Sequence, residues 1–213
     1  MRPVILVFAK APVPGRVKTR LRLHPEDAAA LHSALVRDTV EQLAAYDVEL
    51  YTDEATDAWP DITVTRTIQA PGSLGTKMLA ALDRALVQGR PRTLILGSDT
   101  PALPCSHVDS LLAAQADVAL GPAEDGGYYA ISCRRTHPAM FDKVPWSSPT
   151  TLEATTRAIQ RCGLTVETGP AWFDIDEPAS LERLRDLPGL GRHTAQWLRD
   201  HSGAIEPRQP HGR

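Results

Sequence analysis

The feature that most constrains the fold is a run of six apolar residues, Val4–Ala9, in which β-branched side chains are frequent. Such a run has no polar face, which is typical of a strand that is buried on both sides. A strand of this kind has to lie in the middle of a sheet. The run ends abruptly in a loop that contains Pro12, Pro14 and Gly15.

This loop and the residues that follow it are basic. From residue 10 to residue 22 there are five positive side chains and no acidic one, although the formal net charge of the chain is −3. Positive charge at the carboxyl end of a central strand lies where open α/β sheets bind anions. The segment therefore predicts a phosphate site, and the alternative is a solvated basic turn. It is neither a P-loop nor a dinucleotide fingerprint, because the glycines that those motifs require are missing.

Strands alternate with helices along the rest of the chain. The spacing of apolar residues predicts helices over about 26–45, after the loop 69–75 through Met78 and Leu86, over 106–115, from about 151 to 162, and after Pro178. Shorter apolar or alternating stretches predict strands over 47–52, 62–65, 93–97, 117–121, 128–132 and 164–166. The alternation predicts an α/β fold with a mostly parallel central sheet that is covered by helices on both sides.

Bulk properties limit the class of protein. A chain of 213 residues suffices for one substantial α/β domain, and 42% apolar with 23% charged residues is typical of soluble globular proteins. The small net charge indicates no nucleic-acid or membrane partner. Three scattered cysteines form no disulfide framework or metal pattern, and we find no secretion signal or 18-residue apolar span. We therefore expect a cytoplasmic protein, and the sequence leaves its oligomeric state open.

Two acidic stretches could hold a divalent cation. Asp99 follows the apolar strand predicted over 93–97, and Asp174 and Asp176 would point to the same side of an extended segment. In phosphoryl chemistry, Mg²⁺ is usually held by one or two carboxylates together with the phosphates of the substrate. The alternatives are structural: Asp99 could form a turn, and Asp176 or Glu177 could cap the following helix.

Two further stretches carry candidate binding groups. In Glu124–Tyr129, two glycines permit close approach of the backbone to a ligand, and the tyrosines could line an acceptor pocket. The alternative is a tight hairpin turn with the tyrosines in the core. Trp146–Thr151 puts hydroxyl groups at a helix N-terminus, where they could bind an anion, although the stretch alone favours helix capping.

Taken in order, these motifs resemble the nucleotide-diphospho-sugar transferase (glycosyltransferase A) superfamily. Within it, the chain is similar to the radical-SAM-associated transferase group, which is itself similar to 2-phospho-L-lactate guanylyltransferase. The resemblance covers about residues 3–187 and implies a three-layer α/β/α Rossmann-like sandwich. The motifs that carry it are Lys10–Leu21, Gln69 with Gly72–Gly75, Gly97–Pro101, Asp125–Tyr128 and Asp174–Pro178.

The resemblance also implies roles for individual residues. Lys18 would lie nearest the reacting phosphorus, and Gln69 with the Gly72–Gly75 loop would meet the base or ribose. Asp99, with Asp174 or Asp176, would bind Mg²⁺ or Mn²⁺. The acceptor would border Asp125, Gly126, Gly127 and Tyr128, and the nucleotide would contact Ala9, Lys10, Gly15, Arg16, Lys18, Arg20, Gln69, Gly75 and Ser98. Lys77 departs from the family pattern, which often has arginine there.

The activity implied is metal-dependent nucleotidyl transfer from a nucleoside triphosphate to a small phosphorylated or hydroxyl acceptor, with Lys18 and Asp99 as catalytic residues. The alternative is glycosyl transfer from a nucleotide sugar, and the basic loop favours the first because a triphosphate carries more charge. We expect the transferase domain to span 1–187, a helical extension 188–202 and a disordered tail 203–213. A minor alternative is DNA binding, because Leu187–Ala195 resembles a helix-hairpin-helix signature, although the chain lacks the expected basic surface.

Overall fold

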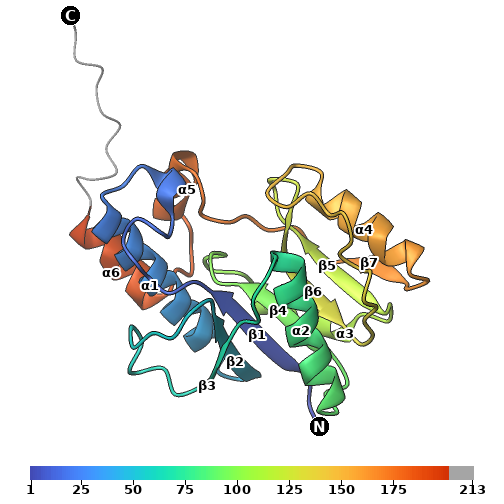
Figure 1. Ribbon diagram of the computed structural model, residues 1–213. Helices are drawn as coiled ribbons and strands as arrows, with labels where there is room; N and C mark the ends of the chain where they lie inside the picture. The colour runs from blue at the N-terminus through green and yellow to red at the C-terminus, as the bar shows by residue number, and fades with distance from the viewer. Residues whose placement is uncertain (202–213) are drawn as a thin grey trace, which may run out of the picture.

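The computed structural model describes residues 1–201, and the tail expected over 203–213 lies outside this range. Within this range, seven strands and six α-helices follow one another, together with one 3₁₀ helix, η1 (Thr19–Leu21) (Figure 1). The strands are β1 (Val4–Ala9), β2 (Asp47–Thr52), β3 (Thr65–Ile68), β4 (Thr93–Gly97), β5 (Val118–Pro122), β6 (Tyr128–Cys133) and β7 (Val166–Thr168). The helices are α1 (Pro25–Gln42), α2 (Leu74–Val87), α3 (Cys105–Ala113), α4 (Thr151–Arg161), α5 (Pro178–Arg185) and α6 (Arg192–Asp200).

All seven strands form one sheet in the order β3-β2-β1-β4-β6-β5-β7. Every strand runs parallel to β1 except β6, which is antiparallel to both β4 and β5. This confirms the prediction of an α/β fold with a mostly parallel sheet. The chain moves outward from β1 to β2 and β3, and β4 then pairs on the other side of β1. Ligands of open α/β sheets bind at such a switch point, outside the carboxyl ends of the strands.

Helices cover both faces of the sheet, so the molecule has three layers. Ile5 and Val7 of β1 pack on one face in a cluster with residues of α1 and α3. Val4 and Leu6 pack on the opposite face with residues of α2 and α4. All four side chains are fully buried. The prediction of a central strand buried on both sides is therefore confirmed.

Two strands lie a few residues later in the chain than the sequence pattern predicts. The expected strand 62–65 is wrong, because β3 begins at Thr65 and pairs with Glu49–Thr52 of β2. Ile62 and Val64 instead pack against the core from a loop. Similarly, β7 begins at Val166, where it pairs with β5. In both stretches the alternation is too short to fix the register, which the neighbouring strand decides.

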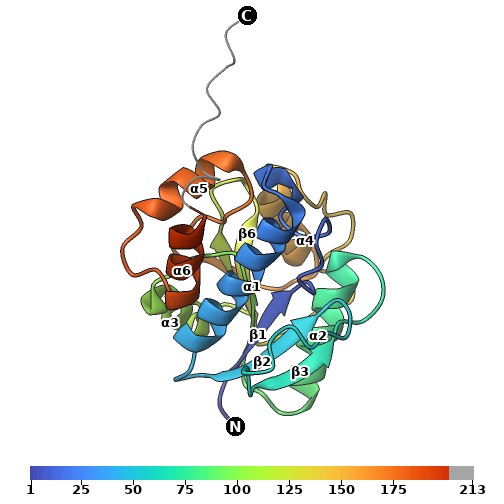
Figure 2. The same cartoon turned by 90° about the vertical axis from the view of Figure 1, so that its left-hand side faces the viewer.

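The segment after residue 187 forms helix α6, which lies along α1 (Figures 1 and 2). Trp197 is buried between them, and its indole Nε1 donates to the carbonyl oxygen of Asp27 at 3.1 Å. At the start of α6, the backbone amides of His193 and Thr194 donate to the carboxylate of Asp38 at 3.0 and 2.8 Å. Two amides that follow the glycine-rich turn 188–191 are therefore bound within the chain.

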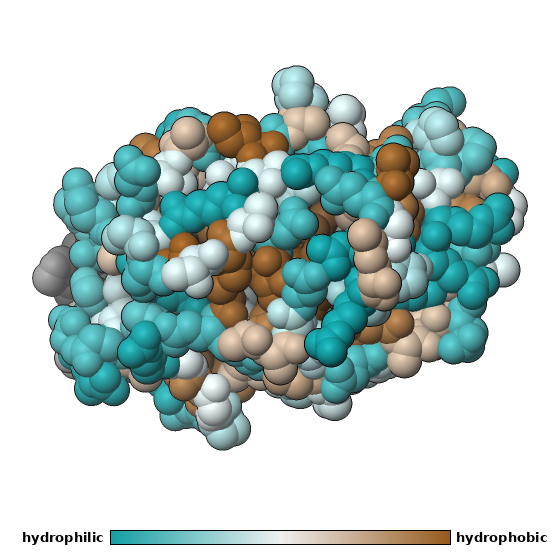
Figure 3. Space-filling view, turned by 90° about the horizontal axis from the view of Figure 1, so that it is seen from below, coloured by the Kyte–Doolittle hydropathy of each residue, from teal (hydrophilic) through white to brown (hydrophobic). Residues whose placement is uncertain are grey.

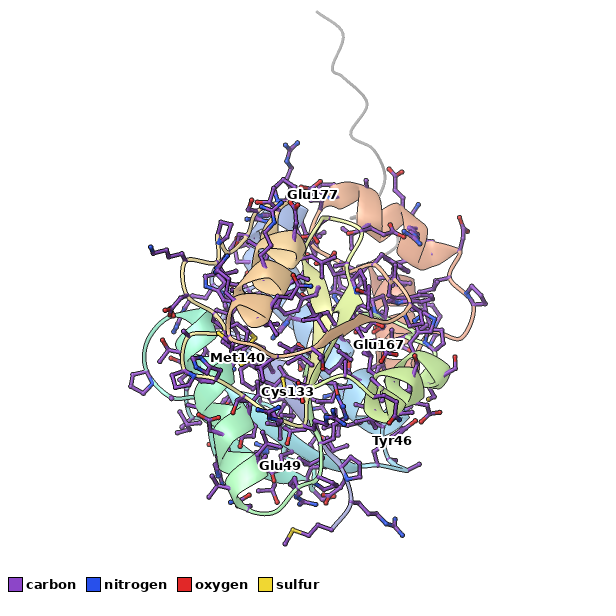
Figure 4. The ribbon with its side chains drawn as sticks, turned by 90° about the vertical axis from the view of Figure 1, so that its right-hand side faces the viewer. Tyr46, Glu49, Cys133, Met140, Glu167 and Glu177 are labelled. Carbon is purple, nitrogen blue, oxygen red and sulfur yellow. The ribbon has the colours of Figure 1, made fainter. Side chains whose placement is uncertain are left out.

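The surface is mostly hydrophilic on the face shown in Figure 3, where apolar residues gather in a hollow near the middle. Among residues 1–201, the exposed large hydrophobic side chains are those of Met1, Ile68, Leu74 and Val87. No helix in this range is long and apolar enough to cross a bilayer. The three cysteines are free thiols, and Cys133 lies in the interior (Figure 4).

Candidate active site

A cavity of about 660 Å³ opens at the carboxyl ends of β1 and β4, which is the switch point of the sheet. Its walls are formed by the loop after β1, the first turn of α2, the turn between β5 and β6, the loop before α4 and the strap 172–177 that leads to α5. It gathers most of the residues that the sequence singled out. Those that line it are Ala9, Lys10, Lys18, Arg20, Gln69, Ser98, Asp99, Asp125, Gly127, Tyr128, Asp174 and Asp176.

Lys18 joins two of these walls to the end of β4. Its Nζ donates to Oδ2 of Asp99 at 2.9 Å and to the carbonyl oxygen of Ile175 at 2.6 Å. Its side chain is only 6% exposed, and its backbone is left-handed with φ of +50°. Non-glycine residues rarely adopt this backbone conformation, and those that do are often found at functional sites. Lys18 therefore fixes the loop after β1 to the end of β4 and to the strap.

The charge of Lys18 also sets the ionisation of Asp99. Burial is the largest influence on this carboxyl and by itself would raise its pKa. The positive charge and the hydrogen bond of Lys18 outweigh burial, and the pKa of Asp99 falls below its ordinary value. Asp99 is therefore an anion at neutral pH.

The pKa of Asp174 is shifted in the opposite direction to that of Asp99. Burial raises its pKa to about 6, and the negative charges of Asp99 and Asp125 add to this effect. Three carboxylates thus act on one end of the cavity, while Lys18 compensates only part of their charge. Hard oxygen donors suit Mg²⁺ or Mn²⁺, but within residues 1–201 these three carboxylates do not form one cluster of ligand atoms, and the cluster that does form is Asp38, Glu41 and His193 between α1 and α6. Asp176 differs from Asp174, because its carboxylate accepts a hydrogen bond from Nη1 of Arg20 at 2.8 Å.

Three of the predicted nucleotide contacts, Gly15, Arg16 and Gly75, do not line the cavity. The guanidinium of Arg16 binds Glu54 at 3.0 Å and Asp53 at 3.8 Å. Lys10 and Lys77 do line the cavity, and neither forms an ion pair within residues 1–201. The cations available to a ligand therefore include Lys77 of α2, which departs from the family pattern.

Side chains beneath the loop after β1 hold its backbone, and two of them, Asp53 and His32, were not predicted from the sequence. The amide of Ala11 donates to Oδ1 of Asp53 at 2.7 Å, and Nε2 of His32 lies 2.9 Å from the carbonyl oxygen of Lys10. Burial lowers the pKa of His32, so the ring is neutral at pH 7. Asp53 directly follows β2, which neighbours β1, and this position could have been noticed in the sequence. His32 lies within the amphipathic helix α1, and its position in the sequence does not indicate that it contacts the loop after β1.

The side chain of Gln69 also supports this backbone. Its Nε2 donates to the carbonyl oxygens of Tyr51 at 3.1 Å and Ala9 at 3.4 Å, at the ends of β2 and β1. The amide group therefore joins two adjacent strands at the rim of the cavity. Its contact with a base or ribose stays a prediction.

Two of the predicted glycines have close packing neighbours instead of facing the cavity. A Cβ atom on Gly75 would lie 2.8 Å from Cβ of Phe141 and 3.0 Å from Cζ2 of Trp146. A Cβ atom on Gly126 would lie 2.1 Å from the carbonyl oxygen of Pro149, and the φ of Gly126 is +88°. Both glycines therefore make room for the loop before α4. Their direct contact with a ligand stays a prediction.

The loop before α4 contributes to the wall through Trp146, Ser147, Ser148 and Pro149. Its hydroxyl groups mostly bond within the loop: Oγ1 of Thr151 donates to the carbonyl oxygen of Pro145 at 2.6 Å, and the amide of Ser148 donates to Oγ1 of Thr151 at 3.2 Å. The predicted N-terminus of α4 is thus organised by side chains of the loop itself. Trp146, which the sequence analysis did not assign to the cavity, is part of its wall.

Comparison with known proteins agrees with this architecture. Residues 30–148, more than half of the chain, match the family DUF2064, described as an uncharacterized protein conserved in bacteria. No protein of the curated set matches. A solved structure from Desulfovibrio desulfuricans G20, provisionally described as a nucleotide-diphospho-sugar transferase, is 30% identical, with a TM-score of 0.85 over 95% of this chain and 96% of that one.

More distant solved structures share the fold. One is CMP:2-keto-3-deoxy-manno-octonic acid synthetase in complex with CTP, with 14% identity and a TM-score of 0.57 over 87% of this chain and 97% of that one. Another is a cytidylyltransferase from Leptospira borgpetersenii serovar Hardjo-bovis, with 14% identity and a TM-score of 0.54 over the whole of both chains. The chain therefore belongs to the DUF2064 family and has the fold of nucleotide-diphospho-sugar transferases.

Proposed function

We propose that this protein is a metal-dependent nucleotidyltransferase that moves a nucleoside monophosphate from a nucleoside triphosphate to a small acceptor. The observation that carries the proposal is the contact of Lys18 with Asp99 in the wall of the switch-point cavity, beside the carboxylate of Asp174. A buried lysine beside carboxylates that can hold a cation is suited to a polyphosphate ligand. The names of two distant structural neighbours, a synthetase bound to CTP and a cytidylyltransferase, support the same reaction class.

The reaction is a displacement at the α-phosphorus. An acceptor oxygen forms a bond to this phosphorus, the bond from the phosphorus to the bridging oxygen breaks, and pyrophosphate leaves with the electron pair. A phosphate acceptor is already ionised and needs no base. A hydroxyl acceptor passes its proton to a carboxylate of the cavity, and Asp125 lies in the wall for this role. Catalysis comes mainly from positioning and charge neutralisation.

Residues of the chain supply the positive charge that this displacement needs. Nζ of Lys18 is held by Asp99 and by the carbonyl oxygen of Ile175, so it needs little reorganisation to stabilise negative charge at the phosphate. Lys10 lies in the same loop and forms no ion pair within residues 1–201, so its charge is available to the β- and γ-phosphates. Arg20 lines the cavity and is shared with Asp176.

Two carboxylates of the cavity are the candidates for holding a divalent cation. Asp99 and Asp174 would hold it, and a positive ion would offset the burial and the repulsion from Asp99 and Asp125 that raise the pKa of Asp174. When bound, such an ion polarises the phosphate oxygens and neutralises charge on the leaving pyrophosphate. Asp176 is a weaker candidate than Asp174, because it is paired with Arg20.

The alternative function is glycosyl transfer from a nucleotide sugar. It is favoured by the 30% identical structure that is provisionally described as a nucleotide-diphospho-sugar transferase. The same cavity and cations would bind the diphosphate, and the acceptor would then attack the sugar carbon instead of phosphorus. The basic loop supports a triphosphate, but its Arg16 is engaged by Asp53 and Glu54, so the preference rests on Lys10, Lys18 and Arg20.

A thermal-shift panel of nucleoside triphosphates and nucleotide sugars, with and without Mg²⁺ or Mn²⁺, tests the proposal. A ligand at about 100 times its dissociation constant adds about 2.7 kcal/mol to the free energy of unfolding, which is roughly 5–10 °C in Tm for a chain of this size. A metal-dependent shift with triphosphates alone supports nucleotidyl transfer, and a shift with nucleotide sugars alone supports the alternative. The absence of any shift contradicts both. Asp99→Ala should abolish the metal dependence, and Asp109→Ala on α3, outside the cavity, should keep it.

A further inference from the structure

Trp146 differs from the three other tryptophans of the chain in whether its indole N–H has a hydrogen-bond acceptor within the protein. The other three Nε1 atoms donate within the protein: Trp59 to Oγ of Ser33, Trp172 to the carbonyl oxygen of Pro101, and Trp197 to that of Asp27. Within residues 1–201, Nε1 of Trp146 has no such acceptor, and the residue lines the cavity. A half-buried indole usually directs its N–H to a partner. This donor is therefore available to a ligand.

The ring of Trp146 is held in place on two sides. Gly75 of α2 lies directly beneath it, and the rings of Phe141 and Tyr128 pack against it with centroids 5.9 and 6.4 Å away. The following residues are also fixed, because Gly126 packs against Pro149. A rigid aromatic side chain loses little conformational entropy when a ligand binds, so it can stack on a ring at low cost.

The surroundings of Trp146 combine apolar contacts with one positive charge. Leu74 and Met78 line the same wall from the first turns of α2, and Leu74 is 45% exposed although it is a leucine. Lys77 lies between them in sequence, lines the cavity and forms no ion pair within residues 1–201. Apolar walls with a few placed polar groups are typical of small-molecule sites.

Different segments form this wall and the proposed phosphate-binding wall. Trp146 comes from the loop before α4 and Lys77 from α2, whereas Lys18 comes from the loop after β1. Both walls face one cavity. The resemblance implies that the base or ribose of the nucleotide lies at the adjoining Gly72–Gly75 loop, and we instead assign the wall of Trp146 and Lys77 to the second substrate.

We propose that the wall formed by Trp146, Lys77 and Leu74 is the acceptor subsite, and that the acceptor is a small anion carrying a ring. The ring stacks on the indole, a polar atom of the acceptor accepts the hydrogen bond of Nε1, and Lys77 neutralises the negative charge. The inference rests on the proposed transferase function, whose acceptor it describes. It also gives Gly75 a positioning role, since a side chain there displaces Trp146.

Simple phosphate esters test this inference without knowledge of the true acceptor. Phenyl phosphate offers a ring and an anion, and methyl phosphate offers the anion alone. We expect phenyl phosphate to bind at least about tenfold more tightly in calorimetric titrations, because ring stacking and apolar burial are worth at least 1.4 kcal/mol together. It should also change the tryptophan fluorescence of the wild-type protein. Equal binding of both esters, or no binding of either, overturns the proposal.

Matched variants locate the site. Trp146→Phe keeps a ring but loses the N–H, and should weaken phenyl phosphate about fivefold and abolish the fluorescence change. Lys77→Gln should weaken it about tenfold. The control Lys143→Gln removes a lysine that does not line this cavity and should change nothing. An effect of Lys143→Gln equal to that of Lys77→Gln contradicts the assignment.

Triphosphate binding by the same variants separates the two proposals. We expect Trp146→Phe and Lys77→Gln to retain the thermal shift with triphosphate and metal. If they lose it, this wall binds the nucleotide and the inference is wrong. If triphosphates bind and phenyl phosphate does not, the inference fails and the proposed function stands. If phenyl phosphate binds at Trp146 and no nucleotide binds at all, the proposed function fails.

Discussion

Replacing Asp174 by asparagine should stabilise the metal-free protein at neutral pH. The pKa of Asp174 is raised from 3.8 to about 6 by burial and by the charges of Asp99 and Asp125. Each pH unit corresponds to about 1.4 kcal/mol, so the ionised carboxylate costs on the order of 3 kcal/mol in the folded state. Asparagine has nearly the same shape and carries no charge. For a chain of this length, a gain of 3 kcal/mol is roughly 6–12 °C in Tm.

The sign of the pH dependence makes this prediction specific. Between pH 4 and pH 6 the folded protein retains the proton of Asp174 that the unfolded chain has lost, so the free energy of unfolding falls as the pH rises. The advantage of Asp174→Asn should therefore be near zero at pH 4 and complete above about pH 7. Asp99 does not contribute in this window, because its lowered pKa places its own effect below pH 4.

Urea unfolding in EDTA at pH 4, 5.5 and 7.5 measures the effect. Asp176→Asn is the matched control: Asp176 forms an exposed pair with Arg20, and its loss should cost at most about 1 kcal/mol. Saturating Mg²⁺ should stabilise the wild type and leave Asp174→Asn nearly unchanged. A variant that is destabilised at pH 7.5 in EDTA, or an advantage that does not depend on pH, would refute the electrostatic account of Asp174.

Three further predictions concern the framework of the site. Lys18→Met should lower the free energy of unfolding by about 2 kcal/mol at pH 7. The loss is smaller than for a fully buried ion pair because the Asp99 side chain is 36% exposed. Urea unfolding at pH 3 should show a smaller loss of unfolding free energy than at pH 7. Gly126→Ala should cost at least about 2 kcal/mol more than Gly163→Ala, since both have positive φ but only Gly126 meets a neighbour; equal unfolding midpoints would contradict the clash. Asp38→Ala should cost about 1–2 kcal/mol by uncapping α6, and unchanged amide exchange in 192–200 would contradict that role.

The sequence predicts the frame of this protein well where apolar runs are long. β1 and β4 are found where their unbroken apolar stretches place them, because only a central strand buries such residues on both faces. Helix α2 begins where Ser73 can cap it, with its side chain accepting from the amide of Thr76. The strands near residues 65 and 166 are displaced from their predicted positions, because pairing with β2 and β5 decides their register.

Only part of the candidate site can be predicted from the sequence. Residues that directly follow strands of the sheet, such as Lys10 and Asp99, could be placed from topology, since parallel strands end at one edge. The pairing of Lys18 with Ile175 spans most of the chain and has no local signal. Packing glycines are equally hidden: Gly75 and Gly126 have the appearance of ligand-binding glycines, yet their neighbours are Phe141 and Pro149.

The most direct test of the account is amide hydrogen exchange with and without a nucleoside triphosphate and Mg²⁺, measured by mass spectrometry on the full chain. Binding at the switch point predicts added protection in segments 9–20, 97–100 and 172–177, and loss of that protection in Asp99→Ala. Unchanged exchange in all three segments at saturating nucleotide would contradict it. Protection confined to segments 137–143 and 154–162, which line a different pocket beside α4, would also contradict it.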